Sequence, residues 1–98
     1  MVIKFGNGEK RPDGSVSYPI KDHQSLLRHV AYRIVTPNQP FGPHEHEGDE
    51  LWYILKGKAI VNIGGKISEV EEKDLIICPS GVSHGMSSDS EVLWLCIG

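Results

Sequence analysis

The stretch Pro43-His44-Glu45-His46-Glu47-Gly48-Asp49-Glu50 concentrates two histidines and several carboxylates in one short segment. His44 and His46 are separated by one residue, so on a strand both imidazoles project from the same face, about 6.6 Å apart along the chain. Glu50 would lie about 13 Å beyond His46 if the chain stayed extended, which is too far to share an ion. Turn-forming residues at 47–49 allow a reversal. We therefore predict that the two histidines end one strand and that Glu50 starts the adjacent antiparallel strand.

Short strands separated by glycine and proline turns surround this segment. Leu51–Leu55 is a compact run of apolar and aromatic residues, which is a strong strand signal. Gly64-Gly65, between Lys58–Ile63 and Lys66–Val70, predicts a two-residue hairpin turn. Further strands are expected over residues 26–36, 74–78, 84–86 and 91–97. Closely spaced short strands of this kind indicate an all-β sandwich, jelly roll or barrel.

Residues 1–25 differ in composition from the rest of the chain. They are polar and rich in glycine and proline, so we expect an irregular N-terminal arm with one short strand, followed by a barrel domain over residues 26–98. Residues 22–32 are ambiguous, because a short helix starting near Asp22 or Ser25 competes there with a strand. No other stretch combines apolar residues at helical spacing with good capping signals.

Length and charge narrow the class of protein. A chain of 98 residues is near the lower end for one domain, so a bound metal or a partner subunit can contribute to its stability. The net charge is −3 and the basic residues are scattered, which argues against a nucleic-acid partner. The longest apolar stretch, Val92–Ile97, is too short to span a bilayer, and residues 1–8 contain no extended apolar segment that could act as a secretory signal. We therefore expect a cytoplasmic protein without a membrane partner.

The remaining candidate groups are two cysteines and three histidines. Cys78 and Cys96 each lie in an apolar, strand-like run, and we interpret them as buried free thiols, with a disulfide between neighbouring strands as the alternative. His84 follows the turn Pro79-Ser80-Gly81, which directs a new strand back across the barrel, so it is the candidate fourth ligand. No comparable turn precedes His23 or His29, so we interpret both as ordinary polar residues.

These intervals resemble the two motifs of the cupin superfamily. His44-x-His46, three residues, Glu50, six residues and Gly57 match the first motif, and Pro79-x-Gly81, two residues and His84 match the second. The sequence departs from the motifs at positions that are not metal ligands: Asn38 and Lys73 stand where each motif begins with glycine, and Ser88 replaces the closing asparagine. The resemblance implies a double-stranded β-helix, or jelly-roll, cupin barrel that holds one metal ion inside its mouth.

The expected ligands, His44, His46, Glu50 and His84, leave two positions open on a six-coordinate ion. Open positions indicate reaction or substrate capture rather than a structural site. Three imidazoles and a carboxylate suit one divalent transition metal, namely Fe, Mn, Ni, Co, Cu or Zn. Strand parity and side-chain chemistry suggest a substrate pocket beside the metal, with a simple core role as the alternative for each residue. The expected pocket residues are Tyr32, Trp52, Ile54, Met86 and Trp94.

The leading functional hypothesis is a small metal-dependent enzyme of dioxygenase, lyase or isomerase type. Its expected substrate, a small oxygen-rich organic molecule, comes from the similarity to metal-bearing cupins. One alternative is a non-catalytic module that binds a small ligand or a metal and signals to a partner. Another is a metal-independent isomerase or epimerase, against which the four intact ligand positions argue. Small cupins are often dimers, so we expect a homodimer in which the arm adds a strand to the partner's sheet.

Overall fold

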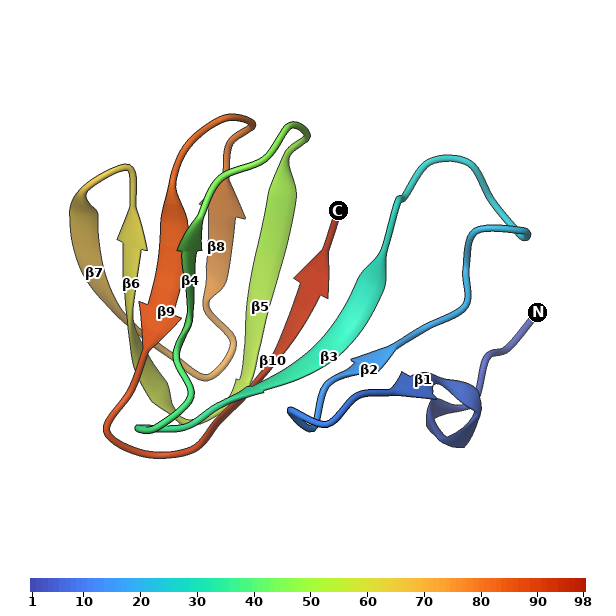
Figure 1. Cartoon of the computed structure of the whole chain (residues 1–98), viewed down its shortest axis with the longest axis horizontal. Helices are drawn as coiled ribbons and strands as arrows, with labels where there is room; N and C mark the ends of the chain where they lie inside the picture. The colour runs from blue at the N-terminus through green and yellow to red at the C-terminus, as the bar shows by residue number, and fades with distance from the viewer.

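The computed structural model describes residues 1–98 and contains two antiparallel sheets that form a jelly-roll barrel (Figure 1). The six-stranded sheet has the order β1-β2-β3-β10-β5-β8, and the four-stranded sheet has the order β4-β9-β6-β7. The expected all-β jelly roll is therefore confirmed. The strands are β1 (Glu9–Lys10), β2 (Val16–Ser17), β3 (Val30–Val35), β4 (Phe41–His44), β5 (Glu50–Lys56), β6 (Lys58–Ile63), β7 (Lys66–Glu71), β8 (Leu75–Cys78), β9 (His84–Ser87) and β10 (Val92–Ile97).

The hairpin of β6 and β7 is confirmed. Ile63 pairs with Lys66, so Gly64 and Gly65 form the two-residue connection. Both glycines have positive φ, 59° and 91°, as a type I′ turn requires. This turn matches the twist of the two strands, and glycine adopts it at little cost because it has no Cβ.

Two positions of the cupin motifs, 57 and 73, adopt a left-handed backbone conformation with positive φ. Gly57 joins β5 to β6 with a φ of 95°, and a Cβ at this position would lie 2.6 Å from the carbonyl oxygen of Glu91. Lys73, which replaces a motif glycine, also has a positive φ of 71°. It is the one non-glycine residue in this conformation, which costs an L-residue about 1–2 kcal/mol. The loop shape is therefore kept although the glycine is not.

The predicted pairing of the strands that carry His44 and Glu50 is wrong. β4 pairs with β9, whereas β5 pairs with β10 and β8 in the other sheet. The turn at residues 47–49 forms its hydrogen bonds with the loop before β9: the Gly48 N–H donates to Ser80 Oγ, and the Ser80 N–H donates to Asp49 Oδ1. The chain therefore crosses from one sheet to the other, and Glu50 faces the histidines across the barrel.

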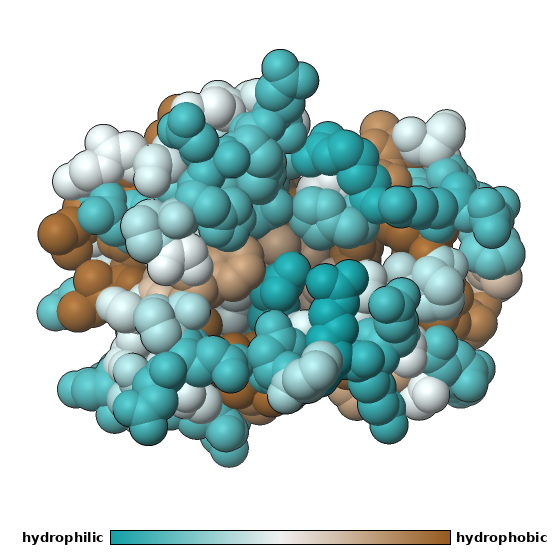
Figure 2. Space-filling model, in the orientation of Figure 1, coloured by the Kyte–Doolittle hydropathy of each residue, from teal (hydrophilic) through white to brown (hydrophobic).

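The core lies between the two sheets. Its largest fully buried side chains are Trp52, Trp94 and Ile54, all on the inner face of the six-stranded sheet, and Val61 and Met86 meet them from the four-stranded sheet. The surface seen in Figure 2 is mostly hydrophilic, as expected when apolar side chains gather inside.

The arm folds against its own chain. β2 pairs with β3, and Phe5 packs on Tyr32 with 5.2 Å between ring centroids. The arm thus contains two short strands rather than one, and it extends the six-stranded sheet beyond β3 (Figure 1). The helix considered within residues 22–32 does not form, because turns lead directly into β3. The one helical element is a 3-10 turn, Phe5–Asn7, and no helix has the length and apolarity to cross a membrane.

Candidate metal centre

Three imidazoles converge at one end of the barrel. His44 ends β4, His46 lies in the turn that follows, and His84 starts β9, where it pairs with His44. The Nε2 atoms of His44 and His84 are 3.2 Å apart, and the rings of His46 and His84 have centroids 4.9 Å apart. One nitrogen from each of the three residues lies within 4.8 Å of the other two. Histidines far apart in the sequence thus form one cluster.

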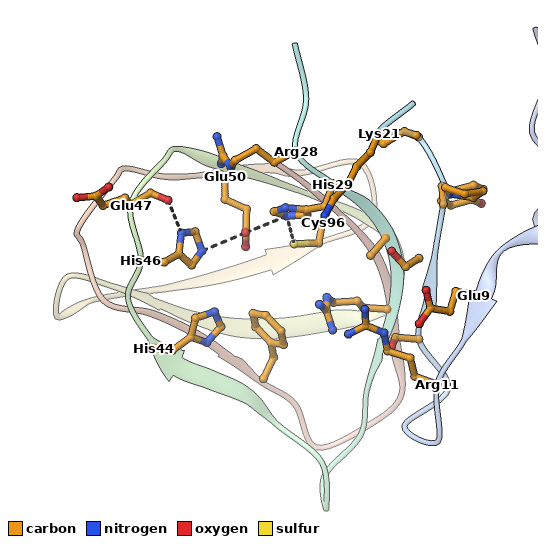
Figure 3. Close-up of a pocket in the computed structure, with 18 of the residues that line it drawn as sticks. Glu9, Arg11, Lys21, Arg28, His29, His44, His46, Glu47, Glu50 and Cys96 are labelled. Atoms are coloured by element: carbon orange, nitrogen blue, oxygen red, sulfur yellow. Dashed lines mark hydrogen bonds and ion pairs between the residues drawn. The ribbon is translucent and has the colours of Figure 1, made fainter. Parts of the chain in front are cut away.

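Glu50 approaches this cluster from the opposite sheet. It is the first residue of β5 and only 3% exposed. Its Oε2 is 3.1 Å from His46 Nε2 (Figure 3), and its Oε1 is 4.0 Å from His84 Nε2. The carboxylate of the fourth predicted ligand therefore lies beside two of the three clustered imidazoles.

Backbone carbonyls orient two of the imidazoles. His84 Nδ1 is 3.0 Å from the Val82 oxygen, and His46 Nδ1 is 3.1 Å from the Glu47 oxygen. Because a carbonyl only accepts hydrogen bonds, Nδ1 carries the proton in each contact and donates it. In the neutral ring, Nε2 is then left with a free lone pair, which is the form that binds a metal.

The distances fit a single ion. Donors at about 2.1 Å from a metal, in adjacent positions of its coordination shell, lie about 3 Å from one another. The separations of 3.1 Å for His46–Glu50 and 3.2 Å for His44–His84 match this spacing. Without a cation, His44 Nε2–H would donate to the lone pair of His84 Nε2, so metal binding replaces this hydrogen bond. The donor set therefore fits a divalent transition metal.

Local electrostatics favour the deprotonated ligands. Burial and the neighbouring His84 hold the pKa of His44 below its ordinary value of 6.5. Burial opposes ionisation of Glu50, but hydrogen bonds from Trp52 and Cys96 outweigh it, so the pKa of Glu50 is lowered. The indole N–H of Trp52 donates to Glu50 Oε1 at 2.7 Å. The carboxylate is thus held in a fixed orientation.

His29 lies beside the site, although the sequence interpretation treated it as an ordinary polar residue. Its Nε2 is 3.1 Å from Glu50 Oε2 and 3.5 Å from Cys96 Sγ (Figure 3). Residue parity could have found it, because His29 shares parity with the inward-facing Ala31 and Arg33 of β3. The structure bears out the expectation that Cys78 and Cys96 are buried free thiols, and burial raises the pKa of Cys78 to about 12.

A cavity of about 1000 Å³ opens beside the histidines and Glu50. Its walls come from the arm, from β3 and from the segment around β4, and they include four basic side chains: Arg11, Lys21, Arg28 and Arg33. Figure 3 shows Arg11 entering from the arm on the side opposite His46. The cavity has the size of sites that bind small organic molecules.

None of the five expected pocket residues lines this cavity. Trp52, Ile54, Met86 and Trp94 are almost fully buried between the sheets, and Tyr32 points to the outer face beneath Phe5. The alternation of side chains along a strand correctly predicts that the four core residues face inward. It does not predict how far each residue lies from the barrel mouth. Residues far from the mouth are enclosed by the opposite sheet. Trp52 instead supports the site from behind, through Glu50 and through an edge contact with His84.

Comparison with solved structures shows the same fold elsewhere. A "predicted oxalate decarboxylase" from Thermotoga maritima superimposes with a TM-score of 0.78 at 22% identity, covering 99% of this chain and 96% of that one. Salicylate 1,2-dioxygenase from Pseudoaminobacter salicylatoxidans, solved with gentisate adducts, superimposes with a TM-score of 0.77 at 13% identity, covering 92% of this chain and 26% of that one.

Sequence comparison gives a distant relative and a family. Gentisate 1,2-dioxygenase from Haloferax sp is 23% identical over 83 residues, which are 83% of this chain, and the chain spans only 23% of that relative's length. The sequence model of the Cupin domain matches residues 31–98, from β3 to the C-terminus. The chain therefore belongs to the cupin family.

Proposed function

We propose that the protein is a metal-dependent cupin enzyme that binds one divalent transition metal through His44, His46, Glu50 and His84. In this proposal the ion faces the adjoining cavity, where a small oxygen-rich organic molecule is bound and transformed. The observation that carries it is the position of Glu50, whose carboxylate reaches across the barrel to within 3.1 Å of His46 Nε2 and 4.0 Å of His84 Nε2. A buried carboxylate among imidazoles is costly unless it is paired or binds a cation.

In this proposal, some residues of the chain orient the metal ligand Glu50 and others bind the organic molecule. Trp52 donates a hydrogen bond to one carboxylate oxygen of Glu50, and His29 contacts the other. These contacts orient the ligand before any substrate arrives. The cavity walls would exclude bulk water and orient the organic molecule. When bound, the metal would supply Lewis acidity to an oxygen-bearing substrate or activate a small co-substrate.

The proposed reaction class is based on the names of similar proteins. The names of the Haloferax relative and of the salicylate enzyme support a dioxygenase, whereas the name of the Thermotoga protein supports a lyase that removes carboxylate. Gentisate, salicylate and oxalate are all organic acids, so we propose an organic acid as the substrate. The chain covers about a quarter of each dioxygenase, so the reaction is a proposal that the turnover experiment tests.

Metal binding is the first test. Untagged protein purified without chelator is expected to contain about one transition ion per chain, identified by elemental analysis. His46→Ala removes one of the proposed ligands and should weaken metal affinity by more than about 100-fold, since even second-sphere changes cost 10–100-fold. His23→Ala, at an exposed turn outside the cavity, is the matched control and should bind metal like the wild type. Equal occupancy in the His46 variant would exclude the proposed ligand set.

Turnover is the second test. The iron-loaded protein is mixed with gentisate, salicylate or catechol while oxygen consumption is recorded, and the manganese-loaded protein is mixed with oxalate while carbon dioxide is recorded. Turnover by the wild type that is lost in His46→Ala would support the enzyme. Saturable binding of these acids without any product would instead favour a non-catalytic binding module.

We also propose that two copies pair through the outer face of the six-stranded sheet. The outward positions on β3, β10, β5 and β8 are apolar or aromatic except for Lys56 at the end of β5, and Leu51, Leu75 and Ile77 are exposed there. Contiguous apolar surfaces of this kind are rare on monomers, and a two-fold dimer brings the same face of both copies together. The apolar and aromatic outward residues are Val30, Tyr32 and Ile34 on β3, Leu93, Leu95 and Ile97 on β10, Leu51, Tyr53 and Leu55 on β5, and Leu75 and Ile77 on β8.

A further inference from the structure

Arg33 is a charged residue on the inner face of β3. Its neighbours of the same parity, Ala31 and Val35, are buried core residues, and its partner across the ladder is Trp94. Arginine is seldom placed on an inward face, because removing a guanidinium from water is costly unless an anion or hydrogen-bond acceptors replace the water. The position therefore calls for a partner.

The structure places the Cys96 thiol beside the guanidinium but no anionic partner within ion-pair distance. Arg33 Nε is buried and lacks a hydrogen-bond acceptor. Every ion pair within 4.0 Å joins a histidine to Glu50, so no carboxylate lies that close to this guanidinium. Asp13 feels its charge from a greater distance, but that carboxylate is engaged by the backbone N–H and hydroxyl of Ser15.

The guanidinium is held in place and faces the cavity. Its central carbon lies 4.9 Å from the centroid of the Phe41 ring, a cation–π contact. Phe41 also contacts His44, with 4.8 Å between ring centroids, so one aromatic ring touches both the arginine and a proposed metal ligand. Trp94 Nε1, the other buried donor without an acceptor, is enclosed in the core, whereas Arg33 lines the cavity.

We propose that Arg33 binds a carboxylate group of the substrate, so that the acid group lies on the Phe41 side of the cavity while the rest of the molecule faces the histidines. A guanidinium presents a planar pair of N–H donors that matches the two oxygens of a carboxylate. Arg11 lines the same cavity from the arm, beside the carboxylate of Glu9. This inference deepens the proposed function by assigning a residue and a substrate group to the cavity.

The first test uses the metal-free protein, benzoate as the probe and benzamide as its uncharged isostere. The side-chain N–H signals of ¹⁵N-labelled arginines are followed by NMR, with the Arg33 signal assigned by its absence in Arg33→Lys. Benzoate should shift the Arg33 Nε–H signal in a saturable way, since it supplies the missing acceptor, and benzamide should not. A signal that does not move up to the solubility limit of benzoate, or that moves equally with benzamide, would overturn the proposal.

The second test compares variants by the same titration, followed through backbone amide signals near the cavity. Arg33→Gln should weaken benzoate binding at least about tenfold, the scale of a lost charge-assisted contact. Lys21→Gln removes an exposed positive charge from the same cavity and should change binding less than about twofold, as weakly coupled surface charges do. Equal weakening in both variants would mean a general attraction of anions and would also overturn the proposal.

The experiments distinguish failure of the proposed carboxylate site at Arg33 from failure of the proposed metal-dependent function. If Arg33→Gln takes up metal like the wild type but loses benzoate binding, the arginine acts on the acid group alone, as proposed. If the wild type binds benzoate at Arg33 but takes up no metal, the carboxylate site stands and the metal-dependent function falls.

Discussion

The two faces of the six-stranded sheet differ from those of a sheet with one solvated face. The inner face carries Glu50, Arg33 and Cys96 near the barrel mouth, whereas the outer face of β3, β10, β5 and β8 carries one charged residue, Lys56 at the end of β5. Sheets with one solvated face normally alternate apolar and polar residues. The charges inside support the proposed metal and carboxylate sites, and the apolar outer residues support the proposed dimer.

The side chains on the inner face change from charged to apolar along β5. Glu50 lies at the mouth, Trp52 comes next and donates to it, and Ile54 lies deeper among apolar side chains. All three side chains point to the same face of the strand. The proposed metal ligand and the core residues therefore differ only in their distance from the barrel mouth. Substitutions at different depths should therefore separate stability from metal binding.

The largest effect is expected from the deep end of the inner face. Trp94→Ala should lower the free energy of unfolding by about 3–5 kcal/mol, because it removes a fully buried indole and leaves a cavity. Urea unfolding of the metal-free protein measures this loss. Leu26→Ala, at a residue 87% exposed, should change it by less than about 0.5 kcal/mol. A loss below about 1 kcal/mol for Trp94→Ala would mean that the inner face is not the packed core.

A charge on the outer face should break the dimer. Ile77 is 60% exposed in the single chain, and Ile77→Lys would place an ammonium in the proposed interface, weakening association by at least about 2 kcal/mol. Light scattering after size exclusion measures the mass. Ile67→Lys is the matched control, since Ile67 is 68% exposed on β7 of the other sheet and should leave the dimer intact. A monomeric wild type, or equal dissociation by both variants, contradicts the proposed interface.

The smallest effect concerns the residue between mouth and core. Trp52→Phe keeps an aromatic ring but removes the N–H that donates to Glu50, so metal affinity should fall about 10–100-fold while the fold is kept. Competition with a chelator of known affinity measures the change. Ile54→Val, one inward position deeper, should cost about 0.5–1.5 kcal/mol of stability and leave metal affinity unaltered. If the two variants bind metal equally well, the hydrogen bond has no role in orienting the carboxylate.

Several features could be predicted from residue types and intervals alone. The diglycine at Gly64-Gly65 defines its hairpin because both residues need positive φ, and alternating apolar residues define the inner faces of β5 and β10. The spacing was enough to select His44, His46 and His84, which the structure clusters, and Glu50, whose carboxylate lies near two of them. Such local rules depend only on backbone geometry, so they can be applied to a linear sequence.

Other features depend on which segments meet in space. The prediction paired β4 with β5, but the loop around Ser80 takes the hydrogen bonds of the intervening turn and separates the two strands into different sheets. His29 contacts Glu50 only because residues at the start of β3 and β5 lie on either side of β10. The cavity walls likewise come from an arm whose sequence alone indicated only an irregular segment.

The sequence by itself determined the all-β class, the side chains with metal-binding chemistry and the alternation of each strand. Only the tertiary structure decided which inward residues stay open to a cavity, which are sealed in the core, and that Arg33 faces the cavity without an acceptor for its Nε–H. The physical reason is that alternation specifies a direction from the strand, whereas exposure and unmet hydrogen bonds depend on what the opposite sheet and the arm place there.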